Sequence, residues 1–357
     1  MKKLLLTASI IISIISSSVV SAEEYPYIYK GIRPMGMGGA FVAISDDANA
    51  LFYNPAGLSS IEEKKVTLLP VEVELSDGGY DAYKDALDVE TENAQETSAF
   101  LREYIGKYYH SAVAVFPNYT RPHFAFGIFG TGKTNFISRD YQYPKLKVDS
   151  VGDAGAALGY AHSFLNDKLS FGASGKFVSR KSLEKEYTLP EITTEDFSDK
   201  VEDDALDGNG VLVDLGVIYR FDDVAAGEGT LKFQAGMSIN NLVGSSMGDA
   251  KDLPEHVDLG VAVKYDLLTL AIDYIDILQN FEQDDDVSKR IRVGAEYLML
   301  KKLIAVRGGF YQGYPTYGFS LNSKYAQLDL LSYAEEMGTY VGQQKNRRYT
   351  FRCAFTF

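Results

Sequence analysis

The feature that most constrains this chain is an alternation of apolar and polar residues that continues to its last position. In the final stretch, RRYTFRCAFTF, the residues Tyr349, Phe351, Cys353, Phe355 and Phe357 fall on one face. Arginine, threonine and alanine fall on the other. Side chains of a β-strand alternate between its two faces, so the stretch predicts a strand with one wholly apolar face.

The same alternation recurs along most of the chain. We expect fourteen strands, near residues 64–75, 109–118, 123–133, 148–162, 168–181, 208–221, 230–241, 255–266, 268–278, 288–299, 302–311, 315–323, 325–333 and 346–357. A tilted strand of about 10 residues crosses a bilayer, with apolar side chains toward lipid and polar ones toward the lumen. The mean hydropathy of -0.12 fits such a protein. The pattern therefore predicts an all-β fold, a 14-stranded antiparallel transmembrane β-barrel.

Loop lengths give an independent prediction of topology. Bacterial barrels join their strands by short periplasmic turns and longer surface loops. With the N-terminus and the C-terminus both periplasmic, the long loops fall on the cell surface, at residues 76–108, 134–147, 182–207, 241–254, 279–287 and 332–345. Apolar residues recur at helix-like intervals in the first of these loops, which predicts a short helical segment there.

The N-terminus has the features of an export signal. Lys2 and Lys3 precede an apolar stretch from Leu4 to Val20, and small residues end it at Ala22. This order predicts a signal peptide over residues 1–22. The alternative is a retained membrane anchor, although the apolar run is short and contains serines. We expect residues 23–63 to form a separate N-terminal part and residues 64–357 to form the barrel.

Composition excludes several classes of function. The formal net charge of -14 disfavours nucleic-acid binding, which relies on Lys and Arg at the phosphates. One cysteine and four scattered histidines offer no metal-ligand spacing and no arrangement for acid–base catalysis. We expect no metal, no other cofactor and no enzymatic activity. The acidic surface loops leave calcium binding open as an alternative to a solvated surface.

One motif points to a different class of protein. The stretch GIFGTGKT, Gly127 to Thr134, matches the pattern of a phosphate-binding P-loop. A P-loop requires a following helix whose N-terminus holds the phosphates, whereas here aromatic residues and Pro144 follow. We expect no nucleotide. In the predicted barrel, Gly130 to Lys133 lie where the third strand leaves the membrane, and Lys133 faces water.

The segment before the first strand, residues 23–63, does not have the composition of a polar tail. It is rich in glycine and carries the apolar side chains of Met35, Met37, Phe41, Phe52 and Tyr53. Fourteen strands enclose a lumen too wide for their own side chains to fill. We expect the segment to fold inside the lumen as a plug, or hatch.

This segment, GIRPMGMGGAFVAISDDANALFYNPAGLS, resembles the N-terminal hatch of the FadL superfamily of outer-membrane proteins. It is most similar to the branches called PorV/PorQ-like and conjugal-transfer TraF-like. The matching residues are Gly36, Gly38, Gly39, Asp46, Asp47, Asn54, Pro55, Ala56 and Gly57. The end of the chain adds to the likeness, because Tyr349, Phe351, Phe355 and the terminal Phe357 resemble the assembly signal that the outer-membrane barrel insertion machinery reads.

The resemblance implies an outer-membrane location, contact with its lipid, and two alternative functions. Characterised FadL-like barrels take up long-chain fatty acids or other hydrophobic compounds. Their ligand binds in a pocket beside the hatch, and the N-P-A region shifts to open a lateral exit at a strand kink. The resemblance therefore implies that the candidate ligand-lining residues here are Met35, Met37, Phe41, Phe52 and Tyr53. Asn54, Pro55 and Ala56 would then be gating residues, unless they only end the hatch and lead into the first strand. The PorV-like and TraF-like branches imply instead a protein partner in secretion, conjugation or envelope assembly.

Charged residues on the predicted lumen face bear on this choice. They are Lys176, Asp214, Lys232, Asp258, Lys264, Asp273, Arg290, Arg292, Glu296, Arg307, Arg348 and Arg352. Such charges can pair across strands, and they disfavour a fatty-acid ligand. An elongated apolar pocket between the hatch and the first long loops would favour transport. A filled lumen with an exposed apolar patch outside the membrane band would favour a protein partner.

Overall fold

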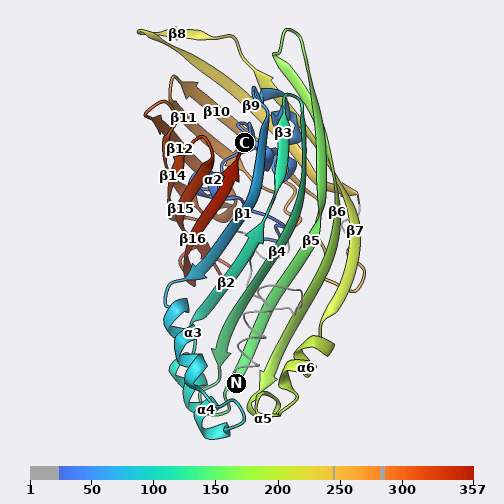
Figure 1. The fold of residues 1–357 in the computed structure, drawn as a ribbon, viewed down its shortest axis with the longest axis vertical. Helices are drawn as coiled ribbons and strands as arrows, with labels where there is room; N and C mark the ends of the chain where they lie inside the picture. Colours follow the sequence, from blue (N-terminus) through green and yellow to red (C-terminus); the bar gives the residue numbers. More distant parts are fainter. Residues whose placement is uncertain (1–23, 244–245, 282–285) are drawn as a thin grey trace.

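The computed structural model describes residues 24–243, 246–281 and 286–357 of the chain (Figure 1). The predicted signal peptide, residues 1–22, lies outside the described residues. Sixteen strands alternate with a few short helices. The strands are β1 (Lys65–Ser76), β2 (Tyr108–Val115), β3 (Asn118–Arg121), β4 (Phe124–Arg139), β5 (Lys145–Phe164), β6 (Leu169–Thr188), β7 (Leu206–Arg220), β8 (Val224–Ala226), β9 (Gly229–Val243), β10 (His256–Tyr265), β11 (Leu268–Tyr274), β12 (Ile291–Met299), β13 (Ile304–Tyr311), β14 (Tyr314–Asn322), β15 (Ala326–Glu336) and β16 (Lys345–Thr356).

These strands close into one antiparallel barrel. Apart from the short strands β3 and β8, each strand pairs with the next along the chain, and β16 pairs with β1 to complete the ring. Strands β2 and β3 both lie between β1 and β4, so together they form one interrupted crossing. The three-residue strand β8 pairs only with β9. The barrel therefore has fourteen crossings, and the predicted strand number is confirmed.

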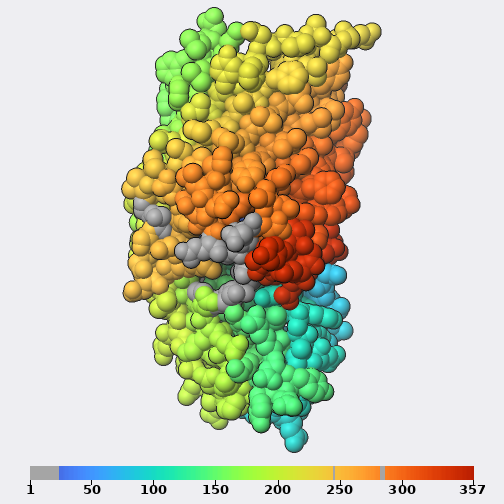
Figure 2. All heavy atoms as spheres, turned by 180° about the vertical axis from the view of Figure 1, so that it is seen from behind, coloured from blue at the N-terminus to red at the C-terminus, as the bar shows by residue number. Residues whose placement is uncertain are grey.

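The barrel wall is much taller on one side than on the other. Strands β5 and β6 have 20 residues each, whereas β11 has 7 and β13 has 8. A strand of 20 residues spans roughly 65 Å, about twice the thickness of the hydrocarbon core. In the view from behind, the green and yellow-green part of the chain extends below the orange and red part (Figure 2). We call this side, formed by β4 to β7, the tall wall.

The tall wall corrects two predictions. The loop expected at residues 134–147 is mostly strand, because β4 and β5 stay paired out to Arg139 and Lys145. The P-loop-like residues Gly130 to Lys133 therefore lie in the middle of β4, and their strand does not end there. The prediction failed because it gave each strand only the length needed to cross a membrane, whereas this hairpin continues beyond it.

Helices gather at one end of the barrel, which we call the helix end (Figure 1). The connection from β1 to β2 contains α3 (Gly79–Asp88) and α4 (Ala94–Glu103), and the connection from β6 to β7 contains α5 (Leu189–Ile192) and α6 (Phe197–Asp203). A further short helix, α7 (Val287–Arg290), precedes β12. The opposite end, which we call the turn end, has short turns such as residues 165–168 and 266–267. No helix in the described residues is long and apolar enough to span a membrane.

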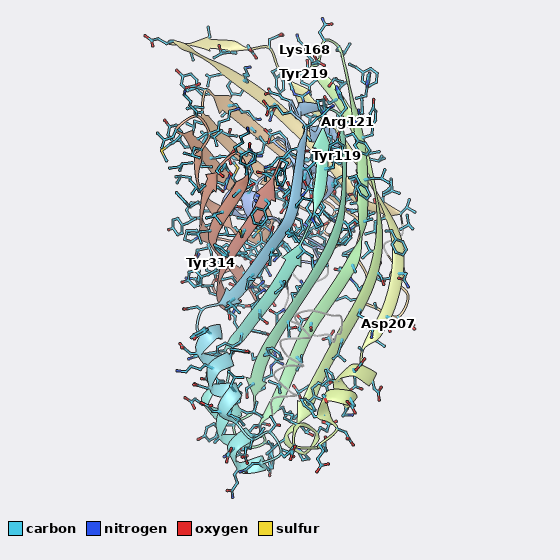
Figure 3. The ribbon with its side chains drawn as sticks, in the orientation of Figure 1. Tyr119, Arg121, Lys168, Asp207, Tyr219 and Tyr314 are labelled. Atoms are coloured by element: carbon cyan, nitrogen blue, oxygen red, sulfur yellow. The ribbon has the colours of Figure 1, made fainter. Side chains whose placement is uncertain are left out.

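Burial is inverted relative to a water-soluble protein. Leucine, valine, phenylalanine and tyrosine side chains project outward from every strand of the ring, whereas Arg290, Arg292 and Arg348 are among the largest fully buried side chains. In Figure 3, Tyr119, Arg121, Lys168 and Tyr219 lie toward the turn end, and Asp207 and Tyr314 lie toward the helix end. Aromatic and charged side chains thus border an apolar outer band, as in barrels that cross a bilayer.

The C-terminal strand contributes to this outer band. Tyr349, Phe351, Phe355 and Phe357 all point outward, with exposed fractions between 47% and 63%. Their even spacing on β16 places them on the lipid side of the closing seam with β1. Their role as an assembly signal remains a prediction.

Candidate functional site

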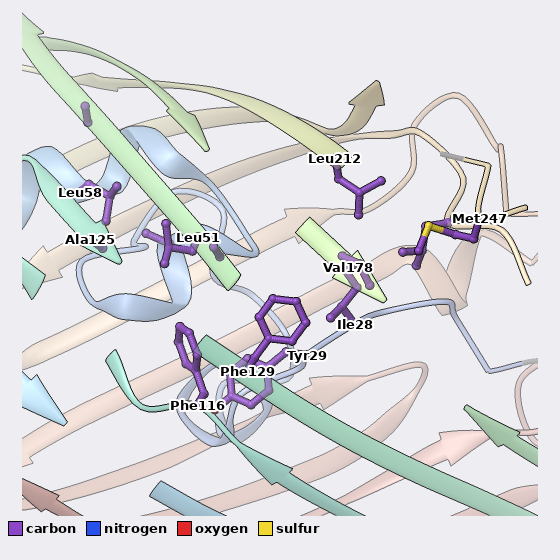
Figure 4. Close-up of a cluster of buried hydrophobic side chains, with 14 of the residues drawn as sticks. Ile28, Tyr29, Leu51, Leu58, Phe116, Ala125, Phe129, Val178, Leu212 and Met247 are labelled. Atoms are coloured by element: carbon purple, nitrogen blue, oxygen red, sulfur yellow. The ribbon is translucent and has the colours of Figure 1, made fainter. Parts of the chain in front are cut away.

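The N-terminal residues Glu24 to Ile61 fold inside the ring, and we call this part the plug. It contains α2 (Ile32–Gly36) and two 3-10 helices, η1 (Ala48–Leu51) and η2 (Pro55–Ser60). Asp47 and Asn54 cap the two 3-10 helices by accepting hydrogen bonds from the backbone N–H groups of Asn49 and Ala56. Side chains of the plug, such as Tyr29, Leu51 and Leu58, join a buried cluster with inward residues of the wall (Figure 4).

Glycines of the wall allow the plug backbone to come unusually close. A Cβ atom added to Gly172 would lie 2.3 Å from the backbone of Pro55 and Ala56, and one added to Gly294 would lie 2.2 Å from the carbonyl oxygen of Met37. Six more inward glycines around the ring also face the plug, because an added Cβ at each would lie within 3.1 Å of a plug atom. They are Gly159, Gly216, Gly236, Gly260, Gly309 and Gly318. We call these residues the glycine belt. Any larger side chain in the belt would have to displace the plug.

Two of the plug glycines that match the FadL-like hatch have no room for a side chain. Gly38 has a φ of +64°, in the left-handed region, and an added Cβ there would lie 2.4 Å from the carbonyl oxygen of Val293. A Cβ atom added to Gly57 would lie 1.9 Å from the carbonyl oxygen of Ser45. A side chain at Gly38 would be strained by both backbone conformation and contact. Two of the predicted hatch glycines are therefore required by geometry.

Asn54 joins the plug to the tall wall. Its side chain is fully buried, and its amide nitrogen donates to the carbonyl oxygen of Val42 at 2.8 Å. Longer hydrogen bonds reach the carbonyl oxygens of Val217 on β7 and Met237 on β9, at 3.3 and 3.4 Å. Asn54 therefore holds two parts of the plug and two strands together. Pro55 and Ala56 follow it directly in η2 and are buried.

A cluster of opposite charges fixes the plug to strands β10 and β12. Arg33 contacts Asp46 and Asp47 at 2.5 and 2.9 Å within the plug, and Glu296 of β12 at 2.7 Å. Lys264 of β10 contacts Asp46 at 2.7 Å. Burial tends to raise the pKa of Asp46, but Arg33 and Lys264 hold it well below its ordinary value. The predicted pair Asp46 and Asp47 thus has a defined docking role.

A second charged cluster surrounds the first described residue of the plug. Glu24 contacts Lys30 at 2.8 Å, Lys133 of β4 at 3.2 Å and Arg348 of β16 at 3.2 Å. Burial opposes its ionisation, yet these three cations hold the pKa of Glu24 well below its ordinary value. The expectation that Lys133 faces water is wrong, because position 133 points into the lumen and its ammonium group pairs with the plug.

The five side chains predicted to line a ligand pocket lie within this packed region. Met37 and Phe41 belong to a buried cluster with Ala262 and Ala271 of the wall. Phe52 stacks on Tyr29, Phe116 and Phe129, and the Tyr53 hydroxyl donates to the carbonyl oxygen of Lys30. Met35 lines a small inner cavity of about 90 Å³, together with polar residues such as Glu24 and His110.

A larger cavity, of about 510 Å³, lies at the helix end. We call it the outer cavity. It lies between the helices α3 to α6 and the outward faces of β1, β2, β4, β5 and β6, on the opposite side of the wall from Lys133 and Asn135. Its lining is mostly aromatic and aliphatic: Leu75, Tyr80, Tyr83, Ala86, Phe100, Leu101, Tyr104, Tyr109, Phe136, Leu146, Val148, Leu183, Ile192, Phe197 and Val201. His110 lines both cavities, so it stands in the partition between the outer cavity and the plug.

The wall is interrupted beside the plug. Strands β2 and β3 are separated by Phe116 and Pro117, and the pairing of β1 with β16 shifts register between Leu68 and Val71. Phe116 turns inward, is 3% exposed, and packs on Tyr29 and Phe52 of the plug. One side of the barrel therefore has a break in its hydrogen bonding that is filled by an aromatic side chain.

The described residues contain no group of three or more His, Cys, Asp or Glu arranged to hold a metal ion. The acidic side chains of the surface loops are instead partly engaged in local contacts. Asp204, for example, pairs with Lys185, and Glu191 accepts hydrogen bonds from the backbone and the side chain of Thr188.

Sequence comparison identifies the family. The profile of the family described as type IX secretion system membrane protein PorP/SprF matches residues 152–357, more than half of the chain. The chain belongs to the PorP/SprF family. The match covers most of β5 and all later strands, and the plug lies before it. No curated protein matches this PorP/SprF chain.

Solved structures that are similar to this chain over most of its length include two toluene transporters and a FadL homologue. The Ralstonia pickettii toluene transporter TbuX is 13% identical, with 91% of this PorP/SprF chain and 97% of that chain covered and a TM-score of 0.51. The Pseudomonas putida toluene transporter TodX is 11% identical, with 95% and 99% covered and a TM-score of 0.46. A Pseudomonas aeruginosa FadL homologue is 10% identical, with 94% and 99% covered and a TM-score of 0.41. The likeness to TbuX shows that the barrel fold of the FadL superfamily is shared.

Together these findings confirm the predicted class of protein. This PorP/SprF chain is an outer-membrane β-barrel of the FadL type. The residues that sequence reasoning missed are the glycine belt and the lining of the outer cavity. The alternation does place the belt glycines on the polar faces of their strands. The lining of the outer cavity comes largely from loop helices, and the strand pattern gives no information on how these helices pack.

Proposed function

We propose that this protein is a structural membrane component of a type IX secretion system, and that its own lumen stays closed to the secreted protein. The family description supports the system. The plug is the observation that supports a closed lumen. The glycine belt lets its backbone contact the wall, and two charged clusters hold it to several strands. A folded or unfolded protein could not pass without breaking these contacts.

In this proposal the turn end faces the periplasm and the helix end faces the outside. Outer-membrane barrels have short periplasmic turns and longer surface connections, and the two ends of this barrel differ in that way. The plug then leads into β1 at the periplasmic end of the barrel, and the acidic helices α3 to α6 lie at the cell surface. The barrel would act through its surfaces, as a protein partner.

The test combines deletion with a tether. In the bacterium that encodes this protein, the gene is deleted and secretion of a type IX cargo into the medium is measured. We expect secretion to fall strongly and to be restored by the intact gene. We also expect restoration by a Met35→Cys and Leu331→Cys pair in a Cys353→Ala background, which links α2 of the plug to β15 inside one buried cluster.

Two outcomes would contradict the proposal. Full secretion in the deletion strain would remove the role in the system. Loss of secretion on oxidation of the tethered protein, with recovery on reduction, would show that the plug must move and that the lumen opens. The Cys353→Ala protein without the pair is the matched control for both treatments.

A second candidate function is the binding and passage of a small hydrophobic compound. The outer cavity is the observation that favours it, because its volume falls within the range of ligand pockets and its lining is apolar. The interruption of the wall at Phe116 and Pro117 offers a place where such a compound could cross the barrel wall. Asn54, Pro55 and Ala56 would then be gating residues. Uptake of a labelled hydrophobic compound by cells with and without the tethered plug tests it, and equal uptake would contradict it.

A further inference from the structure

The outer cavity has a specific electrostatic character, which begins with its lining. Among the described residues that line it, none is Lys, Arg, Asp or Glu, and His110 is the one histidine. A carboxylate placed in the cavity would therefore lose its water without gaining a cationic partner. Burying an unpaired charge of this kind is strongly unfavourable.

The lining is also rich in aromatic rings. Tyr80, Tyr83 and Tyr104 come from the loop between β1 and β2, and Tyr109, Phe136 and Phe197 complete an aromatic enclosure. The face of an aromatic ring carries partial negative charge and attracts cations within about 6 Å of its centre. The same walls that cannot stabilise an anion can therefore stabilise an organic cation.

The two segments that contain the enclosing helices carry almost all of the net charge of the protein. Residues 77–107 contain eight acidic and three basic side chains, and residues 182–207 contain ten acidic and two basic ones. Their net charges of -5 and -8 compare with -14 for the whole chain. Because a helix is about 10–12 Å across, acids on its outer face lie within about one Debye length of the cavity it lines.

We propose that the outer cavity binds a hydrophobic molecule that carries a positive charge, such as an alicyclic or aromatic amine, and discriminates against carboxylates. The inference rests on the second candidate function, that the cavity receives a hydrophobic compound. The acidic helices raise the local concentration of cations at the entrance, and the aromatic lining receives the charged end. Fatty acids, which the superfamily resemblance implied, are disfavoured by the same two features.

The experiment uses the absence of tryptophan from the sequence. Phe100→Trp places a single fluorophore in the cavity lining, and Leu87→Trp places one on the exposed side of the neighbouring helix as a matched control. The full mature protein in detergent is titrated with three probes of the same cage shape: 1-adamantanamine, 1-adamantanemethanol and adamantane-1-carboxylate. At pH 7 the three are a cation, a neutral molecule and an anion.

We expect the amine to shift the fluorescence of Phe100→Trp at a concentration at least about tenfold lower than the carboxylate, with the alcohol between them. The Leu87→Trp signal should not respond. Added salt should weaken amine binding and leave alcohol binding unchanged. Neutralising three exposed acids, with Asp88→Asn, Glu92→Gln and Asp203→Asn in the Phe100→Trp protein, should bring the amine close to the alcohol.

The outcomes separate this inference from the proposal beneath it. Binding of the alcohol equal to or tighter than that of the amine would overturn the charge preference while leaving a hydrophobic site. Tighter binding of the carboxylate would overturn it as well. Resistance to urea would show that the Phe100→Trp protein is folded. If none of the probes then shifted its fluorescence, the cavity would not be a ligand site, and the second candidate function would fail with it.

Discussion

At the scale of single residues, the decisive feature of this barrel is how closely two backbones approach. The alternation in the sequence assigned Gly172, Gly216 and Gly294 to the lumen side of their strands, and that assignment is correct. It did not indicate that they form a belt, because a single strand does not reveal what will lie against it. The belt becomes visible only when the register aligns Gly172 with Gly216 and Gly294 with Gly309.

The glycine belt gives a direct prediction. Gly172→Ala should destabilise the folded protein by about 1–3 kcal/mol, because the new methyl group overlaps the backbone of Pro55 and Ala56. Gly175→Ala, on the same strand, is the control, since an added Cβ there has no atom within 4 Å. The measurement is the midpoint of urea unfolding in detergent micelles. Equal midpoints for the two variants would mean that the plug backbone does not contact the wall closely at Gly172.

At the scale of elements, the plug is a short segment with little regular structure that depends on ion pairs with the wall. Its hydrophobic and glycine content predicted an internal location, and charged residues on the lumen face were expected to pair. Their partners were not predictable, because Arg33 of the plug meets Glu296, 263 residues away, only in the closed barrel. The strand interruption at Phe116 was missed for a similar reason, since the residues around it keep an apolar composition.

The ion pairs make docking of the plug sensitive to acid. The pKa values of Asp46 and Glu24 are lower in the folded protein than in the unfolded chain, so their stabilisation is complete above their ordinary values and is lost as pH falls below them. We expect unfolding midpoints to be constant between pH 7 and about pH 5 and to fall toward pH 3. Phe52→Trp, in a chain without other tryptophan, reports the environment of the plug.

The matched variant for this prediction is Asp46→Asn. It should lower stability at pH 7 by about 1–3 kcal/mol, because Arg33 and Lys264 lose a partner in a partly buried site. Its stability should also change less between pH 5 and pH 3 than that of the wild-type protein. A wild-type midpoint that rises on acidification would contradict the assigned sign.

At the scale of the whole molecule, the protein is an inverted structure, with charges and ion pairs inside and an apolar band outside. This organisation was predictable, because a period of two over fourteen segments, an export signal and alternating loop lengths all indicate the same barrel. The height of the tall wall and the outer cavity were not predictable. Strand pairing beyond the membrane and the packing of loop helices depend on tertiary contacts that leave no period in the sequence.

The central claim is that the barrel is closed by its own N-terminal segment, and conductance across a planar lipid bilayer tests it most directly. The intact mature protein is compared with a variant that lacks residues 31–58, after both are shown to insert as folded barrels. We predict no stepwise conductance for the intact protein and stable open steps for the deletion variant. Equal permeability of the two proteins would contradict the account.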